Sequence, residues 1–166
     1  MTAHVFLYAP QDFHNLCLLA RTLEVFGQRQ CYVFDSARLI RERYGRYRTR
    51  ELRAVSAGAF EKIEWLRVEE PAEFFAEHGA RVVATIASAT ARPLSEHRFG
   101  GNEVLLFGSE SQGLPDDVVA KVGASVTVPQ RGQTQSLNLA VALGIVLFEW
   151  DRQVTLEQHA ASRGAR

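Results

Sequence analysis

The sequence predicts an α/β fold, in which a single-domain parallel sheet is covered by helices on both faces. Short apolar segments alternate along the chain with longer segments whose apolar residues recur at helical spacing. Several of the short segments are apolar throughout, as parallel strands buried on both faces are. The chain of 166 residues, 46% of them hydrophobic, is long enough for one sizeable core and short for two. We therefore expect one domain over residues 1–152, followed by a tail over 153–166 that is either a short helix or frayed.

Each expected element follows from its local pattern. The segments with strand character are His4–Ala9, Gln30–Phe34, Ile63–Val68, Arg81–Ala87, Glu103–Phe107 and Ser125–Val128. The segments with helical character are His14–Phe26, Arg50–Lys62, Ala72–His78, Pro115–Val122 and Leu137–Arg152. Strands that alternate with helices predict a parallel sheet. Ligands of such sheets bind outside the carboxyl ends of the strands, so the loops that follow strands are the places to look for a site.

The distribution of glycine along these loops places the expected site in the C-terminal half. The loop after the first strand, Pro10–Phe13, has no glycine, which argues against an ordinary dinucleotide-binding fold. Glycines occur instead in the loops Gly108–Gly113 and Pro129–Gln135. These two loops follow neighbouring apolar segments, and together they could hold one flat ligand, largely through backbone groups.

The composition of the loop Gly108–Gly113 indicates the kind of ligand. Its glycines allow close backbone approach and positive φ. It carries Glu110 where a phosphate-binding loop would have cationic residues, and Asp116 and Asp117 follow in the next segment. Such a loop suits a neutral or positively charged ligand. The alternative is a tight turn whose aspartates only complement a helix N-terminus.

The loop Pro129–Gln135 leads into the apolar helix through Ser136 and Asn138. Ser136 is a natural N-cap residue for that helix. Asn138 carries an amide close to the first turn of an apolar helix, where its polar atoms need partners. We therefore expect the Asn138 amide, where it is buried, to have hydrogen-bond partners.

Charge and composition exclude several classes of protein. The net charge is zero, which argues against a protein that coats nucleic acid indiscriminately, but residues 38–53 contain seven arginines, two glutamates and two tyrosines. That segment is either an RNA-contacting surface or a solvated face. No apolar stretch is long enough to span a membrane, and no secretory signal is visible, so a cytoplasmic location is expected. Cys17 and Cys31 show no spacing for a metal site or a disulfide.

Three separate motifs carry a resemblance to a known family. They are Asn15-Leu16-Cys17-Leu18-Leu19-Ala20-Arg21, the GSESQGLP stretch that begins at Gly108, and VPQRGQTQSLNLAVALGIVLFE, which begins at Val128. In this order and spacing they resemble the motifs of the SpoU-type RNA ribose 2′-O-methyltransferases of the SPOUT superfamily, over residues 4 to about 150. The resemblance implies S-adenosylmethionine as cofactor, a homodimer, and a deep trefoil knot in the C-terminal part, a rare exception to the rule that chains are unknotted.

The resemblance also implies roles for particular residues. Arg21 would meet the RNA phosphate and ribose, reaching the cofactor of the partner subunit. The residues that would orient Arg21 and the substrate are Asn15, Glu110, Ser136 and Asn138. Those that would hold the cofactor are Ile86, Gly108, Glu110, Val128, Ser136 and Leu137. RNA contacts beyond Arg21 are expected from the arginine-rich segment, at Arg41, Arg43, Arg46 and Arg48.

Two features bear on the substrate. Cys17 stands where many relatives have glycine, and His14-Asn15 with a small residue at 17 is similar to the tRNA D-loop guanosine enzymes. In size the chain is closer to the minimal members that modify the tRNA wobble ribose. We therefore expect an RNA 2′-O-methyltransferase acting on tRNA, with ribosomal RNA as the alternative. A non-catalytic RNA-binding or assembly factor of the same fold is the alternative from another class.

Overall fold

The computed structural model describes residues 3–40 and 50–164, and over these residues it contains one parallel sheet of seven strands. The strands are β1 (His4–Tyr8), β2 (Gln30–Phe34), β3 (Glu64–Arg67), β4 (Val82–Thr85), β5 (Arg92–Pro93), β6 (Val104–Phe107) and β7 (Ala124–Thr127). Their order across the sheet is β3-β2-β1-β6-β4-β7-β5. Every pair is parallel, so all the carboxyl ends lie along one edge.

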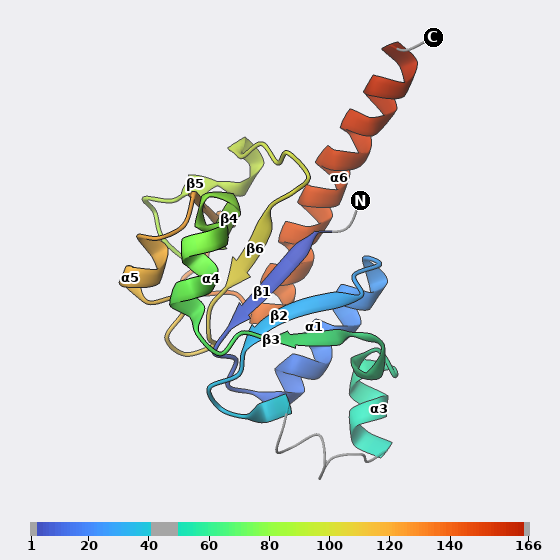
Figure 1. The fold of residues 1–166 in the computed structure, drawn as a ribbon, viewed down its shortest axis with the longest axis vertical. Helices are drawn as coiled ribbons and strands as arrows, with labels where there is room; N and C mark the ends of the chain where they lie inside the picture. The colour runs from blue at the N-terminus through green and yellow to red at the C-terminus, as the bar shows by residue number, and fades with distance from the viewer. Residues whose placement is uncertain (1–2, 41–49, 165–166) are drawn as a thin grey trace.

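Helices cover both faces of this sheet, as the sequence predicts (Figure 1). The α-helices are α1 (Phe13–Val25), α3 (Arg50–Ser56), α4 (Pro71–His78), α5 (Asp116–Val119) and α6 (Leu139–Gly164). Short 3-10 helices are η2 (Phe60–Lys62), η3 (Gly79–Arg81) and η4 (Leu94–Glu96). Helices α1 and α6 pack against each other on one face, and α4 and α5 lie on the other.

Successive residues of the central strand show how the two faces are divided. Val5 and Leu7 of β1 point into a core cluster that includes residues of α1 and α6. Phe6, between them, points into a second cluster with Phe75 of α4 and Val118 of α5. The side chains of a strand alternate between faces, so an apolar run such as this one requires a helix layer on each side.

The helices depart from the predicted bounds in three places. The segment Arg50–Lys62 is divided into α3 and η2 because Ala57 and Gly58 take positive φ of 52° and 74°, which ends a right-handed helix. Helix α5 is shorter than Pro115–Val122, and α6 starts at Leu139 and continues through the predicted tail to Gly164. The strand β5 was not predicted, because two residues are too few to show an alternating pattern.

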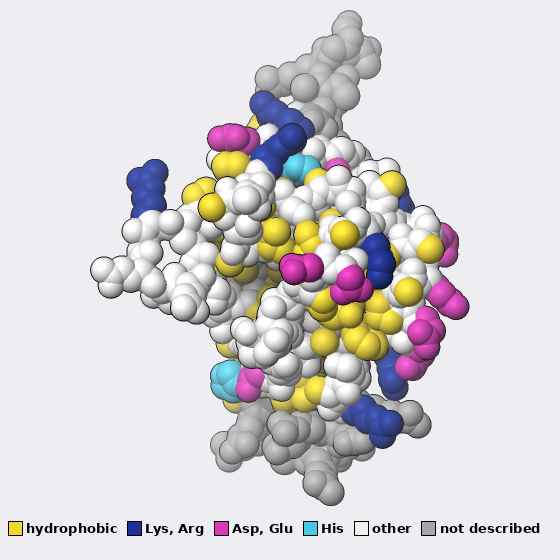
Figure 2. All heavy atoms as spheres, turned by 90° about the vertical axis from the view of Figure 1, so that its left-hand side faces the viewer, with side chains coloured by type: hydrophobic (Ala, Val, Ile, Leu, Met, Phe, Trp, Pro, Cys, Tyr) yellow, Lys and Arg dark blue, Asp and Glu magenta, His cyan; other side chains and the backbone are white. Residues whose placement is uncertain are grey.

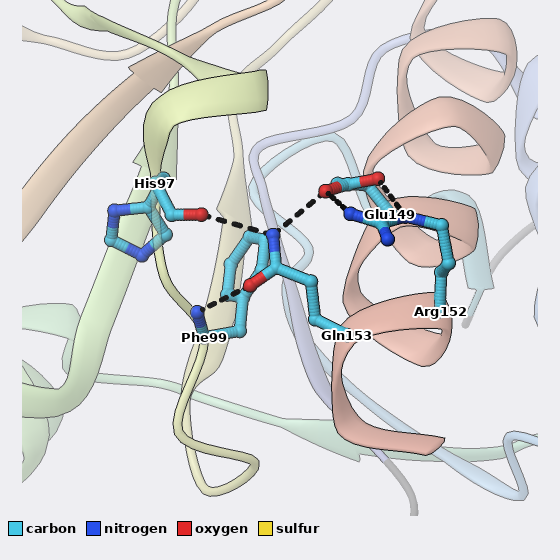
Figure 3. Close-up of polar contacts among 5 residues, drawn as sticks. All are labelled: His97, Phe99, Glu149, Arg152 and Gln153. Atoms are coloured by element: carbon cyan, nitrogen blue, oxygen red, sulfur yellow. Dashed lines mark hydrogen bonds and ion pairs between the residues drawn. The ribbon is translucent and has the colours of Figure 1, made fainter. Parts of the chain in front are cut away.

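The segment between η4 and β6 is fastened to α6 by buried polar contacts (Figure 3). Gln153 donates from Nε2 to the carbonyl oxygen of His97 at 2.9 Å and accepts at Oε1 from the backbone N–H of Phe99 at 3.0 Å. Glu103, at the start of β6, accepts from Trp150 Nε1 at 3.2 Å. These bonds fix the entry of the chain into β6 and hence the loop at its far end.

None of the helices that the structure describes is both long and apolar enough to cross a membrane.

Candidate active site

The site lies where four neighbouring strands end. The carboxyl ends of β1, β6, β4 and β7 stand side by side, and the loops after β6, β4 and β7 surround a cavity of about 740 Å³. The first turns of α1 and α6 complete its wall through Asn15 and Leu139. Figure 2 shows the face of the molecule that carries α4 and α5, with acidic side chains in the middle of it, beside a hollow in which apolar side chains are visible.

The loop after β6 is closed so tightly that only glycine fits at its start. Ser109 and Gly113 exchange two backbone hydrogen bonds, each 3.0 Å between N and O. Gly113 has φ of 65°, a conformation that favours glycine. A Cβ atom at Gly108 would overlap the backbone of Gly113 and Leu114. Position 108 can therefore present only backbone to a ligand in the cavity.

Glu110 connects this loop to the beginning of α1. Its Oε2 accepts from the backbone N–H of Gln11 at 2.8 Å, and its Oε1 accepts from the backbone N–H of Asp12 and from Asn15 Nδ2, both at 3.3 Å. Asp12 in turn caps α1, accepting from the backbone N–H of Asn15 at 2.7 Å. Charge-assisted bonds of this kind are stronger than bonds between neutral groups. Glu110 therefore fixes the loop after β6 against the loop before α1.

Asn138 extends the same chain of hydrogen bonds to α6. Its Nδ2 donates to Asn15 Oδ1 at 2.8 Å, and its Oδ1 accepts from the backbone N–H of Ala140 at 2.9 Å. The expectation that the Asn138 amide has partners is thus confirmed. The cap of α6 is also Asn138 rather than Ser136, because the helix begins two residues later than the sequence predicts. Glu110, Asn15 and Asn138, one from each motif, form a continuous connection.

The structure brings together all the residues predicted to hold a cofactor. They line the cavity as a set: Ile86, Gly108, Glu110, Val128, Ser136 and Leu137. Four of the five predicted catalytic residues, Asn15, Glu110, Ser136 and Asn138, line it too. Their roles in binding and catalysis stay predictions, but their assembly around one cavity is a finding.

Arg21 is the predicted catalytic residue that the cavity does not include. It is exposed on α1, and within residues 3–40 and 50–164 it makes no hydrogen bond or ion pair. One turn further along α1, Val25 is 71% exposed. The predicted RNA-contacting residues Arg41, Arg43, Arg46 and Arg48 lie outside the described residues.

Several lining or supporting residues were missed by the sequence analysis. Gln11 and Asp12 bind Glu110 through their backbone, and Ser111 Oγ donates to Gln11 Oε1 at 2.6 Å. Thr85 also lines the cavity, and its buried Oγ1 has no partner in the described part of the chain. Backbone contacts leave no mark on residue type, so Gln11 and Asp12 could have been found only from their position at the end of the first strand.

Cys17, which stands in the first motif where many relatives have glycine, does not line the cavity. Its side chain is buried in the core between the sheet and α1. Burial, aided by the Asp12 carboxylate, raises the pKa of the Cys17 thiol to about 11, so it stays neutral and is a poor nucleophile at pH 7. Within the part of the chain that the structure describes, no three His, Cys, Asp or Glu side chains gather as metal ligands would.

The cavity has a distinct electrostatic character. The charged side chains that line it are the carboxylates of Glu110 and Asp116, and no Lys, Arg or His of the described residues does so. Its apolar wall comes from Ile86, Leu137 and their neighbours. A ligand with a flat apolar part and a positive charge would match both features.

The comparisons with known proteins agree with this geometry. Residues 2–148 match the model of the SpoU rRNA methylase family. The 23S rRNA (guanosine-2′-O-)-methyltransferase RlmB of Acinetobacter baylyi is 31% identical over 146 residues, which are 86% of this chain and 56% of that relative. The chain thus spans little more than half the length of that protein.

Two solved structures extend the comparison to the fold. A structure described as giving insights into the 2-OH methylation of C/U34 on tRNA superposes with a TM-score of 0.78 at 30% identity, covering 93% of this chain and 97% of the other. An rRNA methyltransferase from Sinorhizobium meliloti with bound AdoMet superposes with a TM-score of 0.73 at 28% identity, covering 91% of this chain and 56% of the other.

Proposed function

Because the chain belongs to the SpoU rRNA methylase family, we propose that it transfers the methyl group of S-adenosylmethionine to a ribose 2′-hydroxyl of RNA. One observation carries the proposal. Glu110, Asn15 and Asn138, far apart in the sequence, join at the rim of a single cavity that residues of all three motifs enclose. A protein that only binds RNA has no need of this connection.

The cavity suits S-adenosylmethionine in size, shape and charge. At about 740 Å³ it falls in the range of small-molecule sites. Its apolar wall can receive the adenine, and Gly108, which has no room for a side chain, offers its backbone to the ligand at close range. The carboxylates at its rim complement a cofactor that carries positive charge. When bound, this cofactor supplies an activated methyl group on a sulfonium.

The residues of the chain would align the reactants rather than form covalent bonds. Transfer to a hydroxyl is an in-line displacement, so its rate depends on orientation and on removal of the hydroxyl proton. The linked Glu110, Asn15 and Asn138 hold the loops that shape the rim. The guanidinium of Arg21 would position an RNA phosphate and stabilise developing negative charge on the hydroxyl oxygen.

The proposal includes a homodimer. The apolar side chains of Val141, Ile145 and Phe148 on α6 are between 37% and 61% exposed, and their spacing places them on one side of the helix. Val25, on the neighbouring α1, adds to the same exposed apolar character. A second copy of the chain that covers this surface would bring Arg21, which lies one turn from Val25, towards the cavity of its partner.

A trefoil knot in the C-terminal part is also proposed. Two contacts support it. Within the segment between β4 and β6, the strand β5 pairs with β7, and His97 and Phe99 bind Gln153 of α6. This one segment therefore borders β7 and α6, two of the elements that follow it in the chain, as a loop that the chain passes through would do.

The substrate is proposed to be tRNA in the cytoplasm. A solved structure concerned with the 2-OH methylation of C/U34 on tRNA superposes on this chain with a TM-score of 0.78 at 30% identity, and this likeness supports tRNA as the substrate. The arginine-rich segment around residues 38–53 would supply the electrostatic contact with RNA that a chain of zero net charge needs.

Methyl transfer to defined RNAs tests the proposal. The purified protein is incubated with S-adenosylmethionine carrying an isotope-labelled methyl group and with total tRNA or ribosomal RNA, and the nucleosides are analysed by mass spectrometry. We expect labelled 2′-O-methyl nucleosides from tRNA. Label on a base, or no transfer by a protein that binds the cofactor, would contradict the proposed reaction, and label in ribosomal RNA alone would contradict the substrate.

Calorimetry with a blocked cavity tests the cofactor site. Leu137→Trp places a large ring against the apolar wall. The native chain is expected to bind S-adenosylmethionine, and the folded variant is expected to lose that binding. A variant that binds as the native chain does would contradict the placement of the cofactor in this cavity.

A further inference from the structure

Two consecutive aspartates at the start of α5 have different surroundings. Asp117 accepts from Lys121 Nζ at 3.2 Å, one turn later on the same helix, and does not line the cavity. Asp116 lines the cavity, and its carboxylate has no hydrogen-bond or ion-pair partner within residues 3–40 and 50–164. The sequence alone does not distinguish the two residues, since both either suit the loop to a positively charged ligand or complement a helix N-terminus.

The other carboxylate of the cavity is already engaged. Glu110 accepts from the backbone N–H groups of Gln11 and Asp12 and from the Asn15 amide. Both of its oxygens are used, and its position is fixed by the three donors. Among the described residues that line the cavity, Asp116 is therefore the carboxylate whose oxygens are free to accept hydrogen bonds. The described lining includes no cationic side chain that could pair with it.

We propose that Asp116 recognises the positive charge of the cofactor and so acts as a specificity-determining residue of this cavity. The inference rests on the proposed function, because it takes S-adenosylmethionine to be the ligand. That ligand has two cationic groups, the sulfonium and the ammonium of its amino-acid end, and either would pair with a carboxylate. A free carboxylate at the cavity rim favours these groups over a neutral nucleoside of the same shape.

The choice between the two cationic groups has a consequence for the product. In the proposed transfer, the bond between sulfur and the methyl carbon breaks with its electron pair staying on sulfur, so the sulfonium becomes a neutral thioether. The hydroxyl oxygen forms the new bond to the methyl carbon and releases its proton to water. If Asp116 pairs with the sulfonium, the product is held less tightly than the cofactor. If it pairs with the ammonium, which the reaction leaves unchanged, product and cofactor both depend on Asp116.

Three ligands of graded charge separate these possibilities. S-adenosylmethionine has the sulfonium and the ammonium, S-adenosylhomocysteine has the ammonium alone as a cation, and 5′-methylthioadenosine has neither. Their dissociation constants are measured by calorimetry at low ionic strength for the native chain, Asp116→Asn and Asp117→Asn. Asp117→Asn is the matched control, since it removes the same charge one residue away and outside the cavity.

We expect Asp116→Asn to raise the dissociation constant of S-adenosylmethionine by about two- to fivefold, the range for a solvent-exposed ion pair. Binding of 5′-methylthioadenosine should stay unchanged in the same variant, and Asp117→Asn should leave all three ligands unaffected. If the binding of S-adenosylhomocysteine weakens as much as that of S-adenosylmethionine, Asp116 contacts the ammonium. If the binding of S-adenosylhomocysteine is unchanged, Asp116 contacts the sulfonium.

The inference and the proposed function fail in different ways. If Asp116→Asn weakens 5′-methylthioadenosine as much as the cofactor, or weakens neither, the role of Asp116 is overturned while the cofactor site stands. A native chain that binds none of the three ligands overturns the proposed function itself, whatever the variant does.

Discussion

At the scale of single residues, Asn138 sets the arrangement of the site. Its Oδ1 is occupied by the cap of α6, so its Nδ2 is the group left to donate to Asn15 Oδ1. Asn15 must then donate with its own Nδ2, which reaches Glu110. The cap of α6 thus sets the orientation of the Asn138 amide, and through it the orientation of the Asn15 amide. The sequence shows that Asn138 needs partners, but the bond spans 123 residues, and no local pattern could have identified Asn15.

Replacement of Asn138 separates its two roles. Asn138→Ala removes the cap and the bond to Asn15, and we expect a loss of about 1 kcal/mol in the free energy of unfolding together with a loss of methyl transfer. Asn138→Ser keeps a capping oxygen but has no amide to donate. It should recover most of the stability and little of the activity. Urea denaturation and methyl-transfer rates provide the two readouts, and full activity in the serine variant would show that the bond to Asn15 is dispensable.

Arg21 offers the opposite case, an exposed residue expected to matter for the reaction alone. Because Arg21 lies outside the cavity and makes no hydrogen bond or ion pair with the described residues, Arg21→Ala should leave the melting temperature and cofactor affinity unchanged. Methyl transfer should fall by at least about 10²-fold, as for other residues that stabilise developing charge. Arg29→Ala, another exposed arginine, is the control. A small effect of Arg21→Ala on the rate would exclude it from the reaction.

At the scale of elements, α6 joins the core, the cavity and the exposed apolar surface. Leu143, Trp150 and Val154 are buried, whereas Ile145 and Phe148 are exposed on another side of the helix. The apolar run in the sequence predicts the body of α6 well. It does not predict the extension to Gly164, because few apolar residues mark the face of the helix after Val154. The break between α3 and η2 escaped prediction for a related reason, since Ala57 carries no signal for positive φ.

Charge placed on the exposed side of α6 should separate the dimer. We expect the double variant Ile145→Glu, Phe148→Glu to be monomeric in sedimentation experiments, with an unchanged circular-dichroism spectrum, since both side chains are exposed in the single chain. Methyl transfer should be lost with the dimer, because Arg21 would no longer reach the partner. Ala76→Glu, exposed on α4 at the opposite face of the sheet, is the matched control. A native chain that sediments as a monomer and is active would overturn this arrangement.

At the scale of the whole molecule, the parallel sheet explains why distant motifs meet. Since β1, β6, β4 and β7 are neighbours, the loops after them converge at one edge. The sequence predicts that the late loops hold the site, because glycine and polar residues mark them. It does not predict the order of the strands, which depends on contacts between segments far apart in the chain. The polar contacts of Gln153, which tie α6 to the segment before β6, are likewise visible only in the folded chain.

The pH dependence of stability should depend on His97, which lies in the segment that Gln153 binds. His97 is buried against Phe99, its Nδ1 has no partner in the described residues, and burial lowers its pKa below the usual value of 6.5; the Glu103 carboxylate opposes this shift and Arg92 adds to it. The unfolded chain therefore binds a proton near pH 6.5 that the folded chain resists. His97 thus contributes stability above pH 6.5, and this contribution declines as the pH falls towards the lowered pKa of the folded state.

Replacing His97 should flatten the pH profile in that window. Urea midpoints are measured from pH 8 down to about pH 5, the range over which an ordinary histidine becomes protonated. We expect His97→Leu to lose less stability between pH 7 and pH 5 than the native chain does, even if it is less stable at pH 8. His14→Leu, at an exposed position at the start of α1, is the matched control. An unchanged slope in His97→Leu would mean that the buried imidazole is protonated as easily in the folded chain as in the unfolded one.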